Sequence, residues 1–294
     1  MLKSFLSITG LQRDNYIFPT VDPKEDGPDC LKDCADCTVH YPAKMKIEKV
    51  APLYGYIKEF HTHVLVATGQ SDWKEKVEQE RGSLMEAFHD SPGSKHGRMM
   101  VSASNLSAPD ADGNSKMENG TTVLLLPSFT FVDSVNPSDV TEAITHFIDT
   151  PLSQDPSKSI TQSPHSRLKH RPCEYDYVVL LCSHKRRDAR CGLTAPLIKR
   201  ELERHLRPQG LYRDVDDERP GGVGIFFVSH VGGHKFSANV LVYRKTEQQM
   251  IWLARVKPEH CEGIVNYTLL QGKVVHPDQQ LRGGFDRLKG LTSW

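Results

Sequence analysis

The stretch that decides the fold is YDYVVLLCSHKRRDARCGLTAPLIKRELERHL, residues 175–206. Its first seven residues are, apart from Asp176, apolar or aromatic and strand-favouring, which predicts a buried strand. Its last twelve residues have the spacing of an amphipathic helix with Pro196 in the first turn, where proline is tolerated. A basic loop carrying Cys182 and Cys191 lies between them. Strand, loop and helix in this order are typical of an α/β layer.

The chain after this stretch continues the same pattern. Strands are expected at 223–230, 238–244 and 249–256, and a final helix at 258–271. The order is β-α-β-β-α with room for one more strand, which is close to a thioredoxin-like topology. We therefore expect an α/β domain over residues 175–294.

The chain before this stretch predicts a second α/β domain over residues 45–150, which has the same coarse element order. Its expected strands are 62–68, 98–105 and 121–132, and its expected helices are 71–88 and 137–149. Residues 1–44 have no sustained periodicity and are expected to form an N-terminal extension. Residues 151–174 are rich in Ser, Pro and Gln and are expected to form a linker.

Composition excludes several classes of protein. The 294 residues include 37 Lys and Arg and 37 Asp and Glu, so bulk charge does not favour nucleic acid or a membrane surface. The apolar runs are shorter than the roughly 20 residues of a membrane helix. The first thirteen residues are mildly basic but lack a secretory h-region. A soluble cytoplasmic protein is expected, and a weak mitochondrial signal leaves a mitochondrial location as the alternative.

A second stretch, SHVGGHKFSANV at residues 229–240, places two histidines four positions apart. On a helix, His230 and His234 would resemble the pair of a zinc hydrolase. Gly232 and Gly233 are poor helix residues, however, and no acid lies between the histidines. A loop whose glycines permit tight turns around a bulky ligand fits better.

Four potential ligands thus follow two strands of one domain: Cys182, Cys191, His230 and His234. Two thiolates and two imidazoles suit either a tetrahedral zinc ion or a 2Fe-2S cluster with histidines on one iron. Structural zinc sites usually carry two to four residues between the paired cysteines. The wider spacing between Cys182 and Cys191 favours the larger, two-metal cluster. His184 also follows Cys182 closely and is the competing histidine ligand.

The motifs CSHKRRDARCGLTAP and SHVGGHKFSANV resemble those of the fungal members of the sucrase/ferredoxin-like group of thioredoxin-like 2Fe-2S ferredoxins. The resemblance extends over most of residues 176–294 and more weakly over 45–150. It implies that Cys182 and Cys191 bind one iron and that His230 and His234 bind the other. It further implies electron transfer or redox homeostasis as the function.

Several expectations about function and partners follow. We find no carboxylate pair for glycoside hydrolysis, so a catalyst with a defined substrate is not expected. The cysteine loop carries four basic residues, which are Lys185, Arg186, Arg187 and Arg190. They favour docking of an acidic electron donor such as a flavin reductase. The alternative is that they form only a solvated face, with Asp188 paired internally. The terminal Trp294 resembles the tail read by the cytosolic iron-sulfur targeting machinery. The alternative function is a zinc-stabilised thioredoxin-like interaction module.

The remaining cysteines divide into two groups. Cys30, Cys34, Cys37 and His40 have the spacing of a possible second metal site, and otherwise are flexible thiols. Cys173 and Cys261 are expected to be ordinary residues, Cys261 on a helix face.

Overall fold

The computed structural model describes residues 16–107, 120–150, 168–214, 217 and 219–294. Within these residues one mixed sheet has the strand order β12-β11-β10-β9-β6-β8-β2-β1-β3-β4-β5, with β7 paired to β8. The strands are β1 (Thr62–Ala67), β2 (Met99–Ser104), β3 (Thr121–Leu126), β4 (Thr130–Val135), β5 (Lys169–Pro172), β6 (Tyr177–Cys182), β7 (Tyr212–Arg213), β8 (Val223–Val228), β9 (Val240–Arg244), β10 (Gln249–Leu253), β11 (Leu281–Asp286) and β12 (Leu291–Ser293). The helices are α1 (Leu84–Asp90), α2 (Val140–Ala143), α3 (Ala189–Leu206), α4 (Cys261–Gly263) and α5 (Pro277–Gln280).

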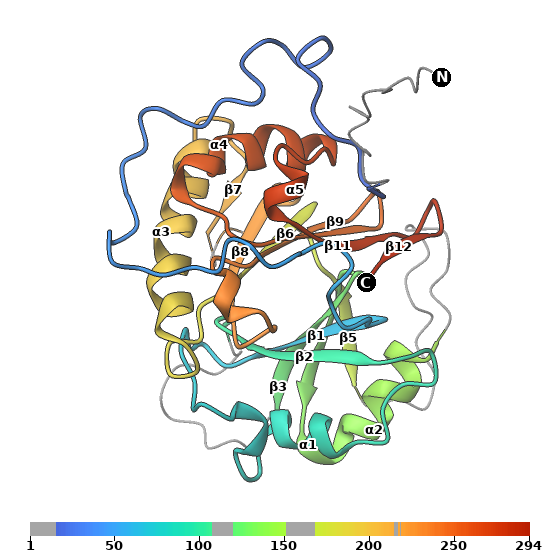
Figure 1. Ribbon diagram of the computed structural model, residues 1–294. Coiled ribbons are helices and arrows are strands. Elements are labelled where there is room, and N and C mark those ends of the chain that lie inside the picture. Colours follow the sequence, from blue (N-terminus) through green and yellow to red (C-terminus); the bar gives the residue numbers. More distant parts are fainter. Residues whose placement is uncertain (1–15, 108–119, 151–167, 215–216, 218) are drawn as a thin grey trace, which may run out of the picture.

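The expected α/β class is confirmed, and the elements form four layers (Figure 1). Helices α3 and α4 cover the outer side of the C-terminal strands, and α1 and α2 cover the outer side of the N-terminal strands. A buried core lies between the N-terminal strands and the C-terminal strands of this sheet. The N-terminal strands contribute residues such as Leu65 and Leu124, and the C-terminal strands contribute residues such as Leu180 and Leu241. The two halves of the chain therefore share a hydrophobic core.

Strand β6 shows why this arrangement suits the sequence. Val178 and Leu180 belong to the core between the two sets of strands, whereas Val179 and Leu181 belong to the core under α3. Successive side chains of a strand point to opposite faces, so a strand covered on both faces is apolar throughout. The apolar stripe of α3 covers one of these faces with Ala195, Ile198, Leu202 and Leu206.

Helix α3 begins at Ala189, six residues before the expected start. The Asp188 side chain accepts a hydrogen bond from the backbone N–H of Arg190 and so caps the helix. Cys191 is therefore in the first turn of α3, and Pro196 lies inside the helix instead of in its first turn. The prediction failed because it gave Pro196 more weight than the cap.

Two N-terminal elements also differ from their predictions. The expected helix 71–88 is reduced to a 3-10 turn at Val77–Gln79 and α1, because Gly82 has a positive φ of 72° and Ser83 starts a new helix as its N-cap. The expected strand 121–132 is a hairpin of β3 and β4. Pro127 has no N–H to donate, so β3 ends just before it.

The segments expected to lie outside the domains are partly ordered against them. Residues 16–44 run over α3 and α4 (Figure 1), and Thr20 forms a β-bridge with Val274. Strand β5 lies in the expected linker 151–174 and pairs with β4, which gives that edge a partner. Residues 1–15 of the extension and 151–167 of the linker are outside the described residues.

The buried His63 on β1 predicts an acid-sensitive fold. Its Nδ1 lies 3.0 Å from the Tyr243 hydroxyl and its Nε2 lies 3.0 Å from the Ser102 hydroxyl. Burial lowers the pKa of His63 from 6.5 to about 3, so the folded chain keeps it neutral. The unfolded chain takes up this proton below about pH 6.5, so stability falls between pH 6.5 and 3, by a few kcal/mol at most. We expect His63→Gln to flatten this slope in urea unfolding; identical slopes would contradict the prediction.

Candidate functional site

The two predicted ligand pairs follow neighbouring strands. Strands β6 and β8 are parallel, and Cys182 is in register with Val228. Cys182 is the last residue of β6, and His230 follows β8 by two residues. The carboxyl ends of parallel neighbours lie at one sheet edge, which is where loops build binding sites in α/β proteins. The topology thus delivers both loops to one place.

The two cysteines are buried and interact with each other. Cys182 and Cys191 are each 1% exposed. The contact between the two thiols, together with burial, raises the pKa of Cys182 well above its usual value. The same contact and a 3.2 Å contact with the Ser237 hydroxyl lower the pKa of Cys191. Cys191 is therefore the more acidic thiol of the pair, and the thiolate is the form of cysteine that binds metals.

The two histidines lie beside each other, and each has one ring nitrogen without a partner among the described residues. The ring centroids of His230 and His234 are 5.1 Å apart. The Nδ1 atom of each is buried and has no hydrogen-bond partner among the described residues. Burial and the neighbouring His234 lower the pKa of His230 to about 4, so this ring is neutral near pH 7. Buried polar atoms without partners are rare, and these two nitrogens each keep a hydrogen-bonding or ligand position unused.

The glycine loop is held in place by a buried arginine. Arg282 on β11 donates from Nη1 to the Gly232 carbonyl at 3.2 Å and to Asn239 Oδ1 at 3.0 Å. Gly233 has a φ of 73°, and a Cβ there would lie 2.6 Å from Arg282 Nη1. The position therefore requires glycine both for its backbone angle and for the close approach of the guanidinium. Burial lowers the pKa of Arg282 to about 10, which leaves it charged at neutral pH.

The competing ligand His184 is already engaged. Its Nδ1 accepts a hydrogen bond from the His230 backbone N–H at 3.3 Å. Its Nε2 faces the carbonyl oxygens of Trp73 and Lys74 at 3.1 and 2.9 Å. Both nitrogens of this buried ring thus have partners. This arrangement gives His184 a positioning role between the His230 loop and the N-terminal half.

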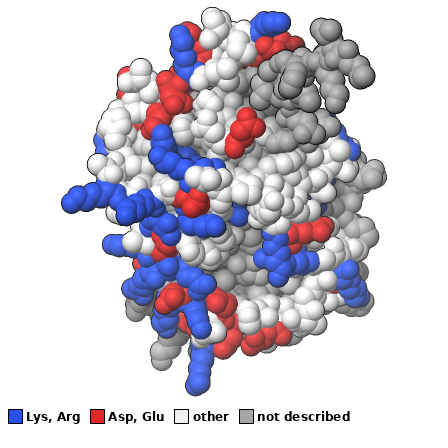
Figure 2. Space-filling model, in the orientation of Figure 1, with Lys and Arg blue, Asp and Glu red and all other residues white. Residues whose placement is uncertain are grey.

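The basic loop is partly neutralised by nearby groups. Arg190 pairs with Asp188 at 2.8 Å, as expected for a solvated face with internal pairing. Arg186 lies 3.6 Å from Asp72, and Arg187 donates to the Glu75 carbonyl. Basic side chains, with acidic ones among them, gather on the side of the molecule where α3 lies (Figure 2). Partial pairing leaves a positive surface beside the candidate site.

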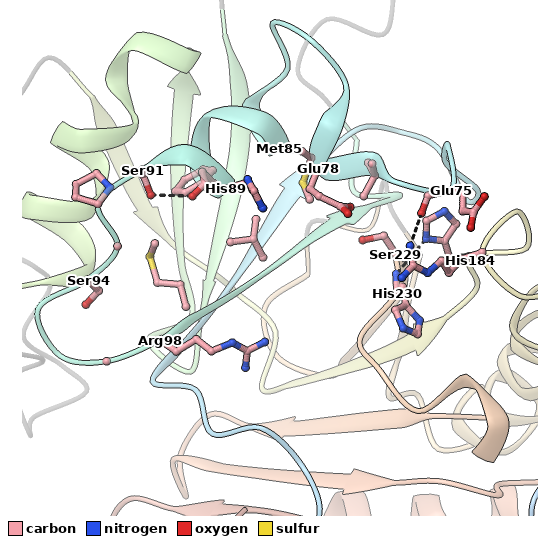
Figure 3. Close-up of a pocket in the computed structure, with 18 residues that line it drawn as sticks. Glu75, Glu78, Met85, His89, Ser91, Ser94, Arg98, His184, Ser229 and His230 are labelled. Carbon is pink, nitrogen blue, oxygen red and sulfur yellow. Dashed lines mark hydrogen bonds between the residues drawn. The ribbon is translucent and has the colours of Figure 1, made fainter.

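A cavity of about 630 Å³ reaches this site from the N-terminal half. His184, Ser229 and His230 lie together at one end of it (Figure 3). Apolar side chains such as Met85 and Phe88 form part of the wall toward α1. His230 is therefore the predicted ligand that this cavity reaches.

The N-terminal cysteines do not gather as their spacing suggests. Cys34 and Cys37 are neighbours, with the Cys37 thiol 3.7 Å from the Cys34 carbonyl oxygen. Among the described residues, the three potential ligand atoms that come within 4.8 Å of one another belong to Cys34, His205 and Glu262. Cys30 and His40 are not part of that group.

Other residues singled out in the sequence have packing roles. Cys173 and Cys261 are fully buried, and Cys261 lies on α4 as expected. The half-buried Trp294 ring lies 5.2 Å from the Phe60 ring and 5.9 Å from the Phe285 ring between centroids. Within the part of the chain that the structure describes, no helix has the length and apolar character to cross a membrane.

Sequence reasoning missed the groups that support the site. Arg282 lies some 50 positions after Gly232 and has no motif of its own, so only the fold places it there. The segment around Trp73 offered one signal, since QSDW at 70–73 belongs to the weaker part of the family resemblance. The Trp73 carbonyl at its end faces His184 Nε2, so this short stretch contacts the cysteine loop.

Comparisons with known proteins agree on one group. The sucrase/ferredoxin-like family profile matches residues 53–283. The chain is 33% identical to actin patches distal protein 1 of Saccharomyces cerevisiae over 244 residues, 78% of this chain and 75% of that protein. It is 38% identical over 127 residues to altered inheritance of mitochondria protein 32 of Clavispora lusitaniae, 41% of this chain and 42% of that protein. The chain matches no solved structure.

Proposed function

This chain belongs to the sucrase/ferredoxin-like family, and we propose that it is a 2Fe-2S redox protein. The proposed ligands are Cys182, Cys191, His230 and His234. One observation carries the proposal: two interacting buried thiols and two histidines with unpartnered buried Nδ1 atoms follow neighbouring parallel strands. Thiolate and neutral imidazole are the donors that a cluster with histidines on one iron requires.

The spread of these donors favours a cluster over a single zinc ion. Zinc binds sulfur at about 2.3 Å and nitrogen at about 2.0–2.1 Å, so ligand atoms around one ion lie within about 4.6 Å of each other. In the described chain, no three of the four proposed ligands have ligand atoms within 4.8 Å of one another. A group with two metals accommodates a wider set of donors. The zinc-stabilised interaction module therefore ranks second.

When bound, the cluster would carry one electron at a potential above that of all-cysteine centres, by analogy with about −150 to +300 mV against about −400 mV. The chain adds to this effect. The buried Arg282 guanidinium holds a positive charge against the glycine loop, and such a charge favours an added electron. Ser237 contacts the Cys191 sulfur at 3.2 Å, and hydrogen bonds to ligand sulfur act in the same direction.

The proposed partner is an acidic electron donor such as a flavin reductase domain. The His234 side chain is 40% exposed, whereas the two cysteines are buried. His234 is thus more open to solvent than the two cysteines, and the cysteine loop carries the exposed basic side chains of Lys185 and Arg186. Complementary charge speeds encounter between redox partners. Because salt screens the attraction between opposite charges, the rate of association of the two redox partners should fall as salt is added.

Three further expectations are part of this proposal. Residues 175–294 are proposed to be a thioredoxin-like ferredoxin unit, acting in electron transfer without a defined substrate. The location is proposed to be cytoplasmic, with cell fractionation to separate it from a mitochondrial one. Trp294 is proposed to recruit the iron-sulfur targeting machinery, for which the ring must leave its contacts with Phe60 and Phe285.

The metal content of the full chain tests the function directly. Protein purified without oxygen is expected to be red-brown, with two irons and two acid-labile sulfides per chain at the proposed site. Reduction by dithionite should produce the EPR signal of one unpaired electron. A colourless chain that carries zinc in place of iron, and cannot be reconstituted with iron and sulfide, would establish the zinc module instead.

A further inference from the structure

A second group of metal-type donors lies away from the proposed cluster ligands. Ligand atoms of Cys34, His205 and Glu262 all lie within 4.8 Å of one another. They come from the N-terminal segment, the end of α3 and α4, so three separate parts of the chain converge. Cys34 is buried, His205 is half-buried and Glu262 is exposed. The group is therefore open to solvent on one side.

Backbone contacts hold the N-terminal segment in this position. The Cys34 N–H donates to the Glu259 carbonyl at 2.9 Å, just before α4. The Thr38 N–H donates to the buried carboxylate of Glu201 on α3 at 3.0 Å. The segment is thus fixed to both helices by contacts that do not use the three donor side chains. Donors held in place in this way need little rearrangement to bind an ion.

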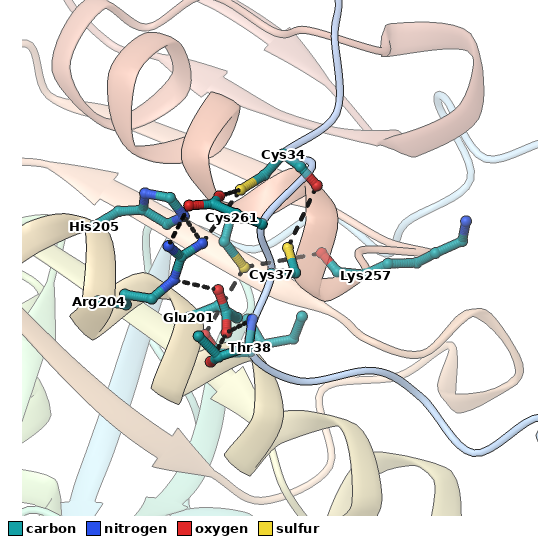
Figure 4. Close-up of polar contacts among 10 residues, drawn as sticks. Cys34, Cys37, Thr38, Glu201, Arg204, His205, Lys257 and Cys261 are labelled. Carbon is teal, nitrogen blue, oxygen red and sulfur yellow. Dashed lines mark hydrogen bonds and ion pairs between the residues drawn. The ribbon is translucent and has the colours of Figure 1, made fainter.

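A cation already sits among these donors. The Arg204 Nη2 atom lies 3.2 Å from the Cys34 sulfur and 3.1 Å from His205 Nε2 (Figure 4). Its Nε donates to Glu201 at 2.8 Å, and its Nη1 lies 3.5 Å from Asp36. Because Nη2 is a donor only, His205 Nε2 faces it with a lone pair, as a metal ligand does. The arginine occupies the place where an ion would bind.

The surrounding charge is not fully balanced by this arginine. Glu201 and Asp36 supply carboxylates to the Arg204 guanidinium, and the Glu262 carboxylate acts on the neighbouring His205 ring. A divalent ion would compensate this charge better than a single guanidinium does. Thiol, imidazole and carboxylate together are a donor set that suits Zn²⁺.

We propose that Cys34, His205 and Glu262 form a binding site for a zinc-type divalent ion, distinct from the proposed cluster, and that Arg204 fills it in the metal-free chain. On binding, the Cys34 proton leaves to solvent and the Arg204 Nη2 atom moves away from the sulfur. The bond from Arg204 to Glu201 can persist through this movement. The fourth ligand is water, or the adjacent Cys37 sulfur after its proton has also left to solvent. The ion would fasten the N-terminal segment to the end of α3.

Because Arg204 competes with the ion, removing a donor and removing the arginine are expected to change the zinc affinity in opposite directions. Zn²⁺ is titrated into the iron-loaded full chain against a chromophoric chelator, and Co²⁺ is used to detect thiolate charge-transfer absorption. Cys34→Ser and Glu262→Gln are expected to weaken binding at least about tenfold. Arg204→Met is expected to tighten it, because the competing cation is gone. Cys30→Ser, a buried thiol of the same segment outside the group, should leave the affinity unchanged.

Two results would overturn the site. One is Zn²⁺ affinity that is unchanged in Cys34→Ser and Glu262→Gln; the other is weaker binding in Arg204→Met, which would assign the arginine a purely structural role. Glu262 is exposed, so its variant tests the site even if Cys34→Ser does not fold. Iron is counted in every sample. Zinc binding that depends on Cys34, observed in a wild-type chain that cannot be loaded with iron, would refute the proposed function but support this second site.

Discussion

Cys191→Ser is expected to leave the purified chain with less than about a tenth of the wild-type iron. The Cys191 thiol is buried in the first turn of α3, contacts the Cys182 thiol and has the lower pKa of the two. A serine hydroxyl does not ionise near neutral pH and is a poor ligand for iron in a sulfide cluster. Iron and sulfide analysis with the visible spectrum measures the loss.

The matched control is Cys173→Ser, which makes the same change in a fully buried thiol outside the site. It should keep its iron. His184→Gln is the control for the histidines, because His184 has partners on both nitrogens, and it should keep the visible band positions that His234→Ala alters. Full iron in Cys191→Ser would reject the ligand assignment. Equal loss in Cys173→Ser would show an effect on folding only.

Gly284→Ala is expected to cost at least about 3 kcal/mol of unfolding free energy. Gly284 lies on β11 with a φ of 147°, and a Cβ there would lie 1.9 Å from the Met250 carbonyl oxygen of β10. Neither the backbone angle nor the contact can relax without breaking the pairing of the two strands. Urea unfolding followed by circular dichroism measures the change.

Gly290→Ala separates the steric clash from the backbone strain. Gly290 also has a positive φ, 65°, but a Cβ there meets nothing within 4 Å. The expected cost is about 1 kcal/mol, the strain of a left-handed alanine alone. Similar losses in the two variants would contradict the clash at Gly284.

The sequence alone predicted the elements whose residues carry a local pattern. The apolar run 177–181 marked β6, the glycines of 229–240 marked a loop, and the spacing of the cysteines and histidines singled out four potential ligands. Local pattern was less reliable at element ends. The start of α3 depends on one hydrogen bond, which the Asp188 side chain accepts from the Arg190 N–H. The end of β3 depends on one missing donor, because Pro127 has no N–H.

Only the tertiary structure decided which distant groups meet. Arg282 reaches the glycine loop, His184 binds the carbonyl groups of Trp73 and Lys74, and His205 replaces His40 beside Cys34. Strand and helix periodicity reports which face of an element is buried, because burial repeats along the chain every two or 3.6 residues. Contacts between groups about 50 to 170 positions apart leave no such period, since they arise from the packing of whole layers against one another.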